Sequence, residues 1–362
     1  MELYARIRTF ILKNRAHGPS VAFALGFIWD SLTLTRVDLL YDNLVLTFYL
    51  TVAALSIVLF QAYEAGRLHS GIMERTVPWL PFIMQFAFGG LMSGYIIYYS
   101  RSGTLIGSWP FLLFLLTLFI GNEVFKKRYQ ILTFQLSILF IAFFSYTIFS
   151  VPVLLRSIGT PQFLLSGAVS LTLIGVIVGI IYYTARARLC EARLPILYAI
   201  TGIYLFFNIA YFTNIIPPIP LALKDLGIYH SVIKTPEGYA VSYERPPWYR
   251  FFDVTSRTYH FTPGEPMYAL SAVFAPTRLD TTILHRWSYY DPRAEKWTVL
   301  SEISFPILGG RGGGYRGYSL KNNIRAGRWR IEVVTPSGQL IGRRTFTVKS
   351  ADTAPDLAQT VK

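Results

Sequence analysis

The sequence predicts a membrane protein of two parts, a bundle of seven transmembrane helices followed by an all-β, immunoglobulin-like antiparallel sandwich. Of its 362 residues, 52% are apolar and only 15% are charged, whereas ordinary soluble domains carry about 25% charged residues. The deficit of charge lies before residue 217, and Pro217, Pro218 and Pro220 mark a step in composition. After these prolines, short β-type segments bounded by turn residues replace the long apolar segments.

The first predicted span is an apolar run at residues 20–34, which follows a basic start at residues 1–15. A basic start and a short apolar run are also typical of a cleaved signal peptide. Here the run contains Trp29 and Asp30, and no clear small-residue cleavage site follows it. We therefore predict a short, uncleaved span.

Six longer apolar segments follow the first one. A helix needs about 20 apolar residues to cross the hydrocarbon core, and each of the six is long enough. We expect transmembrane helices at residues 44–63, 77–99, 105–124, 131–154, 163–183 and 195–216, which complete a seven-span domain over residues 1–216.

Positive charges on the predicted loops set the orientation. With seven spans and a cytoplasmic N-terminus, the inner segments hold twelve lysines and arginines, whereas the outer loops hold only Arg36, Arg101 and Arg156. Without the first crossing, the tally becomes seven inside and eight outside. Because cytoplasmic loops carry the excess of basic residues, we expect the chain to emerge on the outer face of the membrane at residue 217.

Few polar side chains fall inside the predicted spans. A charged residue costs about 2.5–3.5 kcal/mol at the centre of a membrane helix, so the polar positions are candidate sites. We interpret them as partners in hydrogen bonds between helices or as interfacial caps, because a proton-coupled transporter would need an ionisable group at mid-depth. These positions are Asp30, Gln85, Glu123, Gln135 and Asn208.

Two pairs of glycines have the four-residue spacing that lets membrane helices approach closely. The pairs are Gly90 with Gly94 and Gly175 with Gly179. We interpret them mainly as packing positions within the bundle, and they leave homo-oligomerisation open.

The stretch after the prolines divides into three parts. Residues 217–235 are expected to form a neck that contains a short amphipathic helix at 221–234. Residues 236–350 are expected to form the β-sandwich, and residues 351–362 a disordered tail. Segments rich in β-branched and aromatic residues predict eight strands, at 238–244, 258–261, 267–275, 283–290, 296–306, 315–320, 329–335 and 340–348.

Three runs near the C-terminus carry a family resemblance. They are ILHRW at 283–287, GYRGYS at 314–319 and GRWRIEV at 327–333, and Gly338 and FTV at 346–348 follow them. Together they resemble a bacterial C-terminal domain that is classed as a domain of unknown function. A seven-span region before such a domain is similar to a class of proteobacterial inner-membrane proteins. The resemblance implies an inner-membrane location and a periplasmic C-terminal domain, and it supplies no catalytic residues.

Common catalytic and cofactor motifs do not account for this sequence. Gly312, Gly314 and Gly317 fit G-x-G-x-x-G, but a dinucleotide site requires a helix next, within a βαβ unit. The one cysteine, Cys190, excludes a disulfide within the chain and a zinc site built on several cysteines. We therefore expect no cofactor and no metal, and we favour a non-enzymatic role.

A hydrolytic or metal site would have to be assembled from histidines that lie far apart in the sequence. Folding could bring two of His230, His260 and His285 together with Asp253 or Glu265. We favour isolated structural histidines over such a site.

Basic and aromatic residues interleave after Pro217, where 19 lysines and arginines outnumber 12 aspartates and glutamates. Such a surface suits anionic groups, because guanidinium groups bind carboxylates and phosphates in pairs of hydrogen bonds. Nucleic acid recognition uses a similar pattern, but a location outside the cytoplasm argues against it. In the alternative interpretation the tryptophans are in the core and the arginines lie beside the anionic membrane. The candidate ligand-binding residues are Arg286, Trp287, Arg311, Tyr315, Arg316, Tyr318, Arg328 and Arg330.

The sequence thus favours a multi-pass membrane protein whose periplasmic β-sandwich binds an envelope component. The candidate partners, besides the lipid bilayer itself, are an anionic glycan, a lipid headgroup and a partner protein. The alternative is a transporter or flippase in which the β-sandwich gates the outer mouth of the helical bundle.

Overall fold

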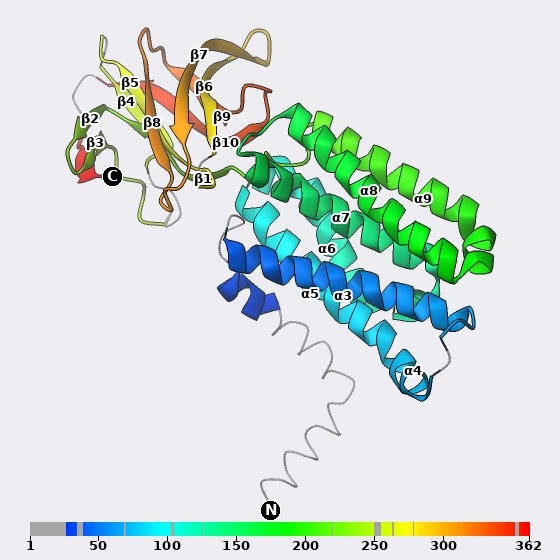
Figure 1. Cartoon of the computed structure of the whole chain (residues 1–362). Coiled ribbons are helices and arrows are strands. Elements are labelled where there is room, and N and C mark those ends of the chain that lie inside the picture. The colour runs from blue at the N-terminus through cyan, green and yellow to red at the C-terminus, as the bar shows by residue number, and fades with distance from the viewer. Residues whose placement is uncertain are drawn as a thin grey trace, which may run out of the picture. The chain divides into compact units, whose positions relative to one another are not determined.

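The computed structural model describes residues 27–34, 39–68, 70–102, 105–124, 126–218, 220–249, 255–262, 264–277, 279–351 and 355–362. The chain forms two compact units, a helical one that ends at Thr213 and a β-rich one from Asn214 on, and the second also includes the segments Ser100–Trp109 and Pro152–Thr160 (Figure 1). This division confirms the predicted order of a helical N-terminal half and a β C-terminal region. Each unit is described by itself below.

The helical unit contains five helices that are long and apolar enough to cross a membrane, at Leu40–Glu64, Gly71–Ser100, Leu132–Leu155, Thr160–Thr184 and Arg186–Phe212. A shorter apolar helix covers Trp109–Asn122. The first predicted span lies largely outside the described residues, and its described end is helical at 27–33. The individual helices are α3 (Leu40–Glu64), α4 (Gly71–Thr76), α5 (Leu80–Ser102), α6 (Leu105–Val124), α7 (Leu132–Leu155), α8 (Thr160–Thr184) and α9 (Arg186–Phe212), with 3-10 turns at Val77–Trp79 and Lys126–Gln130.

One of the two glycine pairs packs as predicted. A side chain at Gly90 would begin 2.7 Å from the Tyr49 ring, and one at Gly94 would begin 2.9 Å from Leu46 Cδ2. Both neighbours lie on α3, so these glycines let α3 and α5 approach closely. By contrast, no described atom lies within 4 Å of the corresponding point at Gly175 or Gly179.

The β-rich unit contains three sheets. The five-stranded sheet has the order β4-β10-β9-β6-β7, and two three-stranded sheets have the orders β1-β5-β8 and β11-β3-β2. Pairing is antiparallel throughout except between β4 and β10, which run parallel. The strands are β1 (Ala222–Tyr229), β2 (Ser231–Thr235), β3 (Gly238–Tyr243), β4 (Thr258–Phe261), β5 (Met267–Phe274), β6 (Asp280–Asp291), β7 (Lys296–Leu308), β8 (Tyr315–Lys321), β9 (Gly327–Val334), β10 (Leu340–Ser350) and β11 (Ala358–Val361).

All eight strands predicted after residue 235 are confirmed within a few residues, and two other predictions are wrong. The segment 221–234 is β1 and β2 rather than an amphipathic helix, because β1 pairs with β5 along its length. Gly227 lies in the middle of this segment, where it would weaken a helix. The predicted disordered tail contains β11, whose backbone completes the otherwise unpaired edge of β3.

The core of the β-rich unit lies between the five-stranded sheet and the β1-β5-β8 sheet. Its largest side chains are Trp287 and Trp329, both fully buried. A second, smaller cluster around Tyr229 and Leu270 packs the other face of the β1-β5-β8 sheet against the β11-β3-β2 sheet. The face of the five-stranded sheet that points away from the β1-β5-β8 sheet is therefore outside this core. The candidate site lies on this outer face.

Candidate functional site

Four charged residues form a row across the outer face of the five-stranded sheet. The strand register aligns Arg343 of β10, Glu332 of β9, Arg286 of β6 and Glu302 of β7. Neighbours on one face of a sheet are close enough for their side chains to interact. Arg343 donates from Nε (2.7 Å) and Nη2 (2.6 Å) to Glu332 Oε1, and Arg286 donates from Nε to Glu302 Oε1 at 2.5 Å. The alternation of charge orients both guanidinium groups.

Two further arginines lie beside this row and stack on aromatic rings. The guanidinium carbon of Arg330 lies 4.4 Å from the ring centroid of Trp297, and that of Arg328 lies 5.2 Å from the centroid of Tyr290. The two rings contact each other edge to face at 5.4 Å. Burial lowers the pKa of Arg330, and nearby Glu332 opposes that effect. Both contacts are cation–π interactions, which hold each guanidinium group over its ring.

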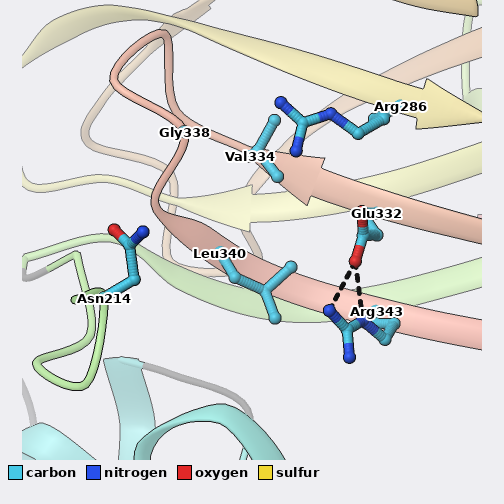
Figure 2. Close-up of a pocket in the computed structure, with 7 residues that line it drawn as sticks. All are labelled: Asn214, Arg286, Glu332, Val334, Gly338, Leu340 and Arg343. Carbon is cyan, nitrogen blue, oxygen red and sulfur yellow. Dashed lines mark hydrogen bonds and ion pairs between the residues drawn. The ribbon is translucent and has the colours of Figure 1, made fainter. Parts of the chain in front are cut away.

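A pocket of about 260 Å³ opens beside the charged row (Figure 2). Figure 2 shows the guanidinium group of Arg286 on one side and the Arg343–Glu332 ion pair on the other. Among the described residues, the Nη1 and Nη2 groups of Arg286 have no bonded partner. The volume is below the 300–1,000 Å³ typical of pockets for drug-sized ligands, so the pocket fits a small group. It is lined by Asn214, Arg286, Glu332, Val334, Gly338, Leu340 and Arg343.

The structure brings three of the eight predicted ligand-binding residues together on this face: Arg286, Arg328 and Arg330. Trp287 follows Arg286 in β6 and therefore points to the opposite side of the sheet. It is fully buried and donates from Nε1 to Ser319 Oγ at 3.0 Å. We therefore remove Trp287 from the candidate site.

The other four predicted residues belong to a different sheet. Tyr315, Arg316 and Tyr318 lie on β8, and Arg311 precedes that strand with its guanidinium carbon 5.6 Å from the Tyr315 ring centroid. Tyr318 contacts the ring of Tyr239 on β3 at 6.0 Å. The basic and aromatic residues thus form two groups instead of one patch.

The arginine face comprises the charged row together with Arg328, Arg330, Tyr290 and Trp297. Its members that the predicted ligand-binding residues do not include are Glu302, Glu332, Arg343, Tyr290 and Trp297. The signal for Arg343 was available, because the Thr335-Pro336-Ser337-Gly338 turn joins β9 and β10 and so pairs Arg343 with Glu332. Backbone N–H of Gly338 donates to Thr335 O at 2.9 Å in this turn. The pairing of β6 with β9 joins segments far apart in the sequence, which local patterns do not reveal.

Two of the three histidines considered above do meet at a carboxylate. His260 Nδ1 lies 2.8 Å from Glu244 Oε2, and His230 Nε2 lies 3.2 Å from Glu244 Oε1. Burial tends to raise the pKa of Glu244, but hydrogen bonds from both histidines outweigh it and lower the pKa. The sequence favoured isolated histidines and named Asp253 and Glu265 only as possible partners, whereas the carboxylate here is Glu244. Residue 253 lies outside the described residues. Within the described part of the chain, no three His, Cys, Asp or Glu side chains are arranged to hold a metal ion.

The third histidine, His285, lies inside the core of the β-rich unit. Its Nε2 is 2.8 Å from Ser271 Oγ, and its Nδ1 is 2.8 Å from Ser319 Oγ. The side chain is fully buried, and burial lowers its pKa to about 3. A neutral imidazole that bridges two strands of the opposing sheet acts as a structural cross-link.

Amide side chains link the helices of the helical unit. Gln61 Nε2 donates to Gln135 Oε1 at 2.7 Å, and Gln135 Nε2 donates to the carbonyl of Tyr129 at 2.5 Å. Gln85 and Asn122 each donate to the other's backbone carbonyl, at 3.1 and 3.0 Å. These contacts join α3 to α7 and α5 to α6, and they match the interpretation of Gln85 and Gln135 as partners in hydrogen bonds between helices.

The remaining polar candidates of the helical unit have different surroundings. Asn208 donates to a carbonyl one turn earlier in its own helix, at 2.8 Å. Asp30 is partly buried, and the side chain of Glu123 lies outside the described residues. A buried carboxylate that the sequence did not indicate is Asp42, which accepts a hydrogen bond of 2.9 Å from Tyr98.

Comparison with known proteins gives one partial match. A family model described as a protein of unknown function, DUF2914, matches residues 280–348. The match spans β6 to most of β10 and therefore includes the whole charged row. It supports the predicted resemblance to a C-terminal domain of unknown function, and the helical unit lies outside it. No curated protein matches the sequence.

Among solved structures, the Pseudomonas fluorescens alkylpurine DNA glycosylase AlkC, bound to DNA containing an abasic site analog, aligns over 87% of this chain and all of that chain. The sequence identity is 10% and the TM-score is 0.22. A TM-score of this size carries no argument about fold or function.

Proposed function

We propose that this chain is a multi-pass protein of the bacterial inner membrane whose β-rich unit lies in the periplasm and binds an anionic group of an envelope component. The observation that carries the proposal is the pocket beside the charged row, with Arg286 and Arg343 on two of its sides. The face as a whole carries four arginines, Arg286, Arg328, Arg330 and Arg343, against two glutamates. It therefore keeps an excess of positive charge.

The glutamates prepare the arginines for a ligand. A guanidinium group presents five N–H donors in a planar fork that matches a carboxylate or a phosphate. Glu302 takes the Nε donor of Arg286, so the two Nη groups remain for a ligand. Because the side chain is already oriented, less conformational entropy is lost when an anion binds.

The size and lining of the pocket favour a small anionic group attached to a larger molecule. Val334 and Leu340 supply an apolar wall, and Asn214 supplies an amide. A carboxylated sugar, a phosphorylated headgroup and an acidic side chain of a partner protein all meet these requirements. A carboxylate and a phosphate both offer the paired oxygens that arginine binds best.

The membrane placement rests on the helical unit and on the charge asymmetry of its loops. The full proposal is seven spans, a cytoplasmic N-terminus and a periplasmic immunoglobulin-like sandwich. Five helices long and apolar enough to cross a membrane support it, as does the excess of basic residues on the inner loops. The alternative, a transporter or flippase, is less favoured because Gln85 and Gln135 bond to neighbouring helices.

The test is ligand binding by the full chain reconstituted in lipid nanodiscs. Saturation-transfer NMR would use glucuronate and glycerol 1-phosphate as anionic probes and glucose as the neutral control. We expect both anions to bind and glucose not to bind. Loss of one charged hydrogen bond costs about 1.5–3 kcal/mol, so Arg286→Gln and Arg343→Gln should each weaken binding about tenfold or more.

The matched control is Arg293→Gln, which changes an exposed arginine in the turn between β6 and β7. Its binding should equal that of the unchanged protein. Equal binding of glucose and the anions, or equal loss in all three variants, would rule out the arginine face as the site.

A further inference from the structure

The loop between β3 and β4 presents the most exposed tryptophan among the described residues. Trp248 is 83% exposed, and its neighbour Tyr249 is 59% exposed. The two rings meet edge to face at 6.1 Å. Arg245, at the start of the loop, is also exposed. The two rings and the nearby arginine therefore place apolar and basic groups together at the surface.

The base of this loop is held firmly. Ser256 N donates to Glu244 O at 3.0 Å, and His260 N donates to Glu244 Oε1 at 2.6 Å. Arg344 donates to the carbonyl of Thr255. These bonds fasten the two described ends of the loop, at Glu244 and at Thr255 to His260, to the β-rich unit.

The sequence of the loop restricts its conformation further. Pro246 and Pro247 precede the aromatic pair, and each proline fixes its own φ near −65°. Because the backbone before Trp248 is restricted, less conformational entropy is lost when Trp248 binds a surface.

We propose that residues 245–249 form an interfacial anchor, in which Trp248 inserts into the headgroup region of a bilayer that contains anionic phospholipids. Tryptophan and tyrosine prefer the membrane–water interface because their rings are apolar with a polar edge. Arg245 supplies the positive charge that anionic headgroups attract. This inference rests on the proposed membrane location, which keeps a bilayer within reach of the β-rich unit at all times.

The bilayer explains the loop better than a protein groove does. A protein groove would have to match the shape of both rings, whereas the described part of the loop offers two exposed rings near one exposed arginine. An interface needs only shallow insertion of rings beside basic residues. A protein partner would leave the loop in water when the purified protein is alone in a nanodisc, so the experiment below separates the two.

The experiment measures the depth of a nitroxide spin label by electron paramagnetic resonance in the full chain. Cys190→Ser removes the one native thiol, and Pro247→Cys places the label beside Trp248. Nanodiscs contain phosphatidylcholine with or without phosphatidylglycerol. We expect the label at 247 to be accessible to oxygen and protected from a water-soluble nickel complex, more so with phosphatidylglycerol. Adding Trp248→Ala should move the label into water.

Two control labels make the outcomes distinct. Ile233→Cys lies on β2 at an exposed position and should report water, whereas Leu165→Cys lies on α8 at an exposed position and should report lipid. If the label at 247 behaves like that at 233 while the label at 165 reports lipid, the anchor is overturned and the membrane location stands. If the label at 165 also reports water, the membrane location itself is refuted.

Discussion

The buried histidine of the β-rich unit gives a prediction about acid stability. His285 has a pKa of about 3 in the folded protein, because burial disfavours its charged form, against an ordinary value of 6.5. The unfolded chain therefore binds a proton at a higher pH than the folded chain does. Acidification below pH 6.5 favours unfolding, and the effect saturates below pH 3.

The magnitude follows from the same two values. A difference of one in pKa is worth about 1.4 kcal/mol, so complete protonation corresponds to about 5 kcal/mol of lost stability. Between pH 6.5 and pH 5, the loss from this residue should be about 2 kcal/mol. Glu244 also has a lowered pKa, but its contribution is lost only below its unfolded value of 4.5, so the two pH windows differ.

The perturbation is His285→Asn, which replaces the imidazole by a group that does not titrate. Urea unfolding of the full chain in nanodiscs, followed by tryptophan fluorescence, gives the free energy of unfolding at each pH. Trp287 and Trp329 are buried in the core of the β-rich unit, as His285 is, so their fluorescence reports the unfolding of this core. The variant should be less stable at pH 8, because its buried partners lose hydrogen bonds, and it should lose the steep decline between pH 6.5 and pH 5.

The control is Ser319→Ala, which removes one hydrogen-bond partner of His285 but keeps the imidazole. This variant should retain the acid slope at a lower overall stability. The other histidines are present in the unchanged protein and in both variants. Their contributions to the pH dependence therefore cancel when the three proteins are compared. An unchanged slope in His285→Asn would refute the assignment of the acid sensitivity to burial of this residue.

Three further predictions concern packing, charge and the C-terminal strand. Gly94→Ile should lower the stability of the helical unit by about 1–3 kcal/mol, since its side chain would meet Leu46, whereas Gly175→Ile should leave thermal unfolding unchanged. Glu332→Gln should raise affinity for glycerol 1-phosphate about fivefold in the same NMR titration, because the amide oxygen can still accept the hydrogen bond that orients Arg343 while a negative charge leaves the pocket; weaker binding would contradict the proposed site. Deletion of residues 358–362 should lower the free energy of unfolding by about 1–2 kcal/mol and promote aggregation through the uncovered edge of β3, measured by urea unfolding and light scattering.

The elements that the sequence predicted well depend on local patterns. Long apolar segments identify helices because a bilayer-spanning helix needs a fixed length, and period-two alternation places Trp329 inward and Arg330 outward in β9. The same alternation shows that Arg286 and Trp287 cannot share a face. The inclusion of both in one candidate site came from grouping residues by type, without their strand geometry.

The elements that the sequence did not predict depend on contacts between distant segments. The apolar spacing in 221–234 suits a helix or a strand, and pairing with β5 decides between them. β11 looks disordered by composition, yet backbone hydrogen bonds to β3 do not require particular side chains. The charged row needs β6, β7, β9 and β10 in register, and the meeting of His230 and His260 at Glu244 needs three separated segments.

The claim on which this account depends is that the β-rich unit lies outside the cytoplasm. Labelling of cysteines with a membrane-impermeant maleimide in intact bacterial cells tests it most directly. Native Cys190 lies in a segment assigned to the inner side, and Ile233→Cys adds an exposed thiol on β2. We predict that position 233 is labelled in intact cells and that Cys190 is labelled only after lysis. Labelling of Cys190 but not of position 233 in intact cells would contradict the account.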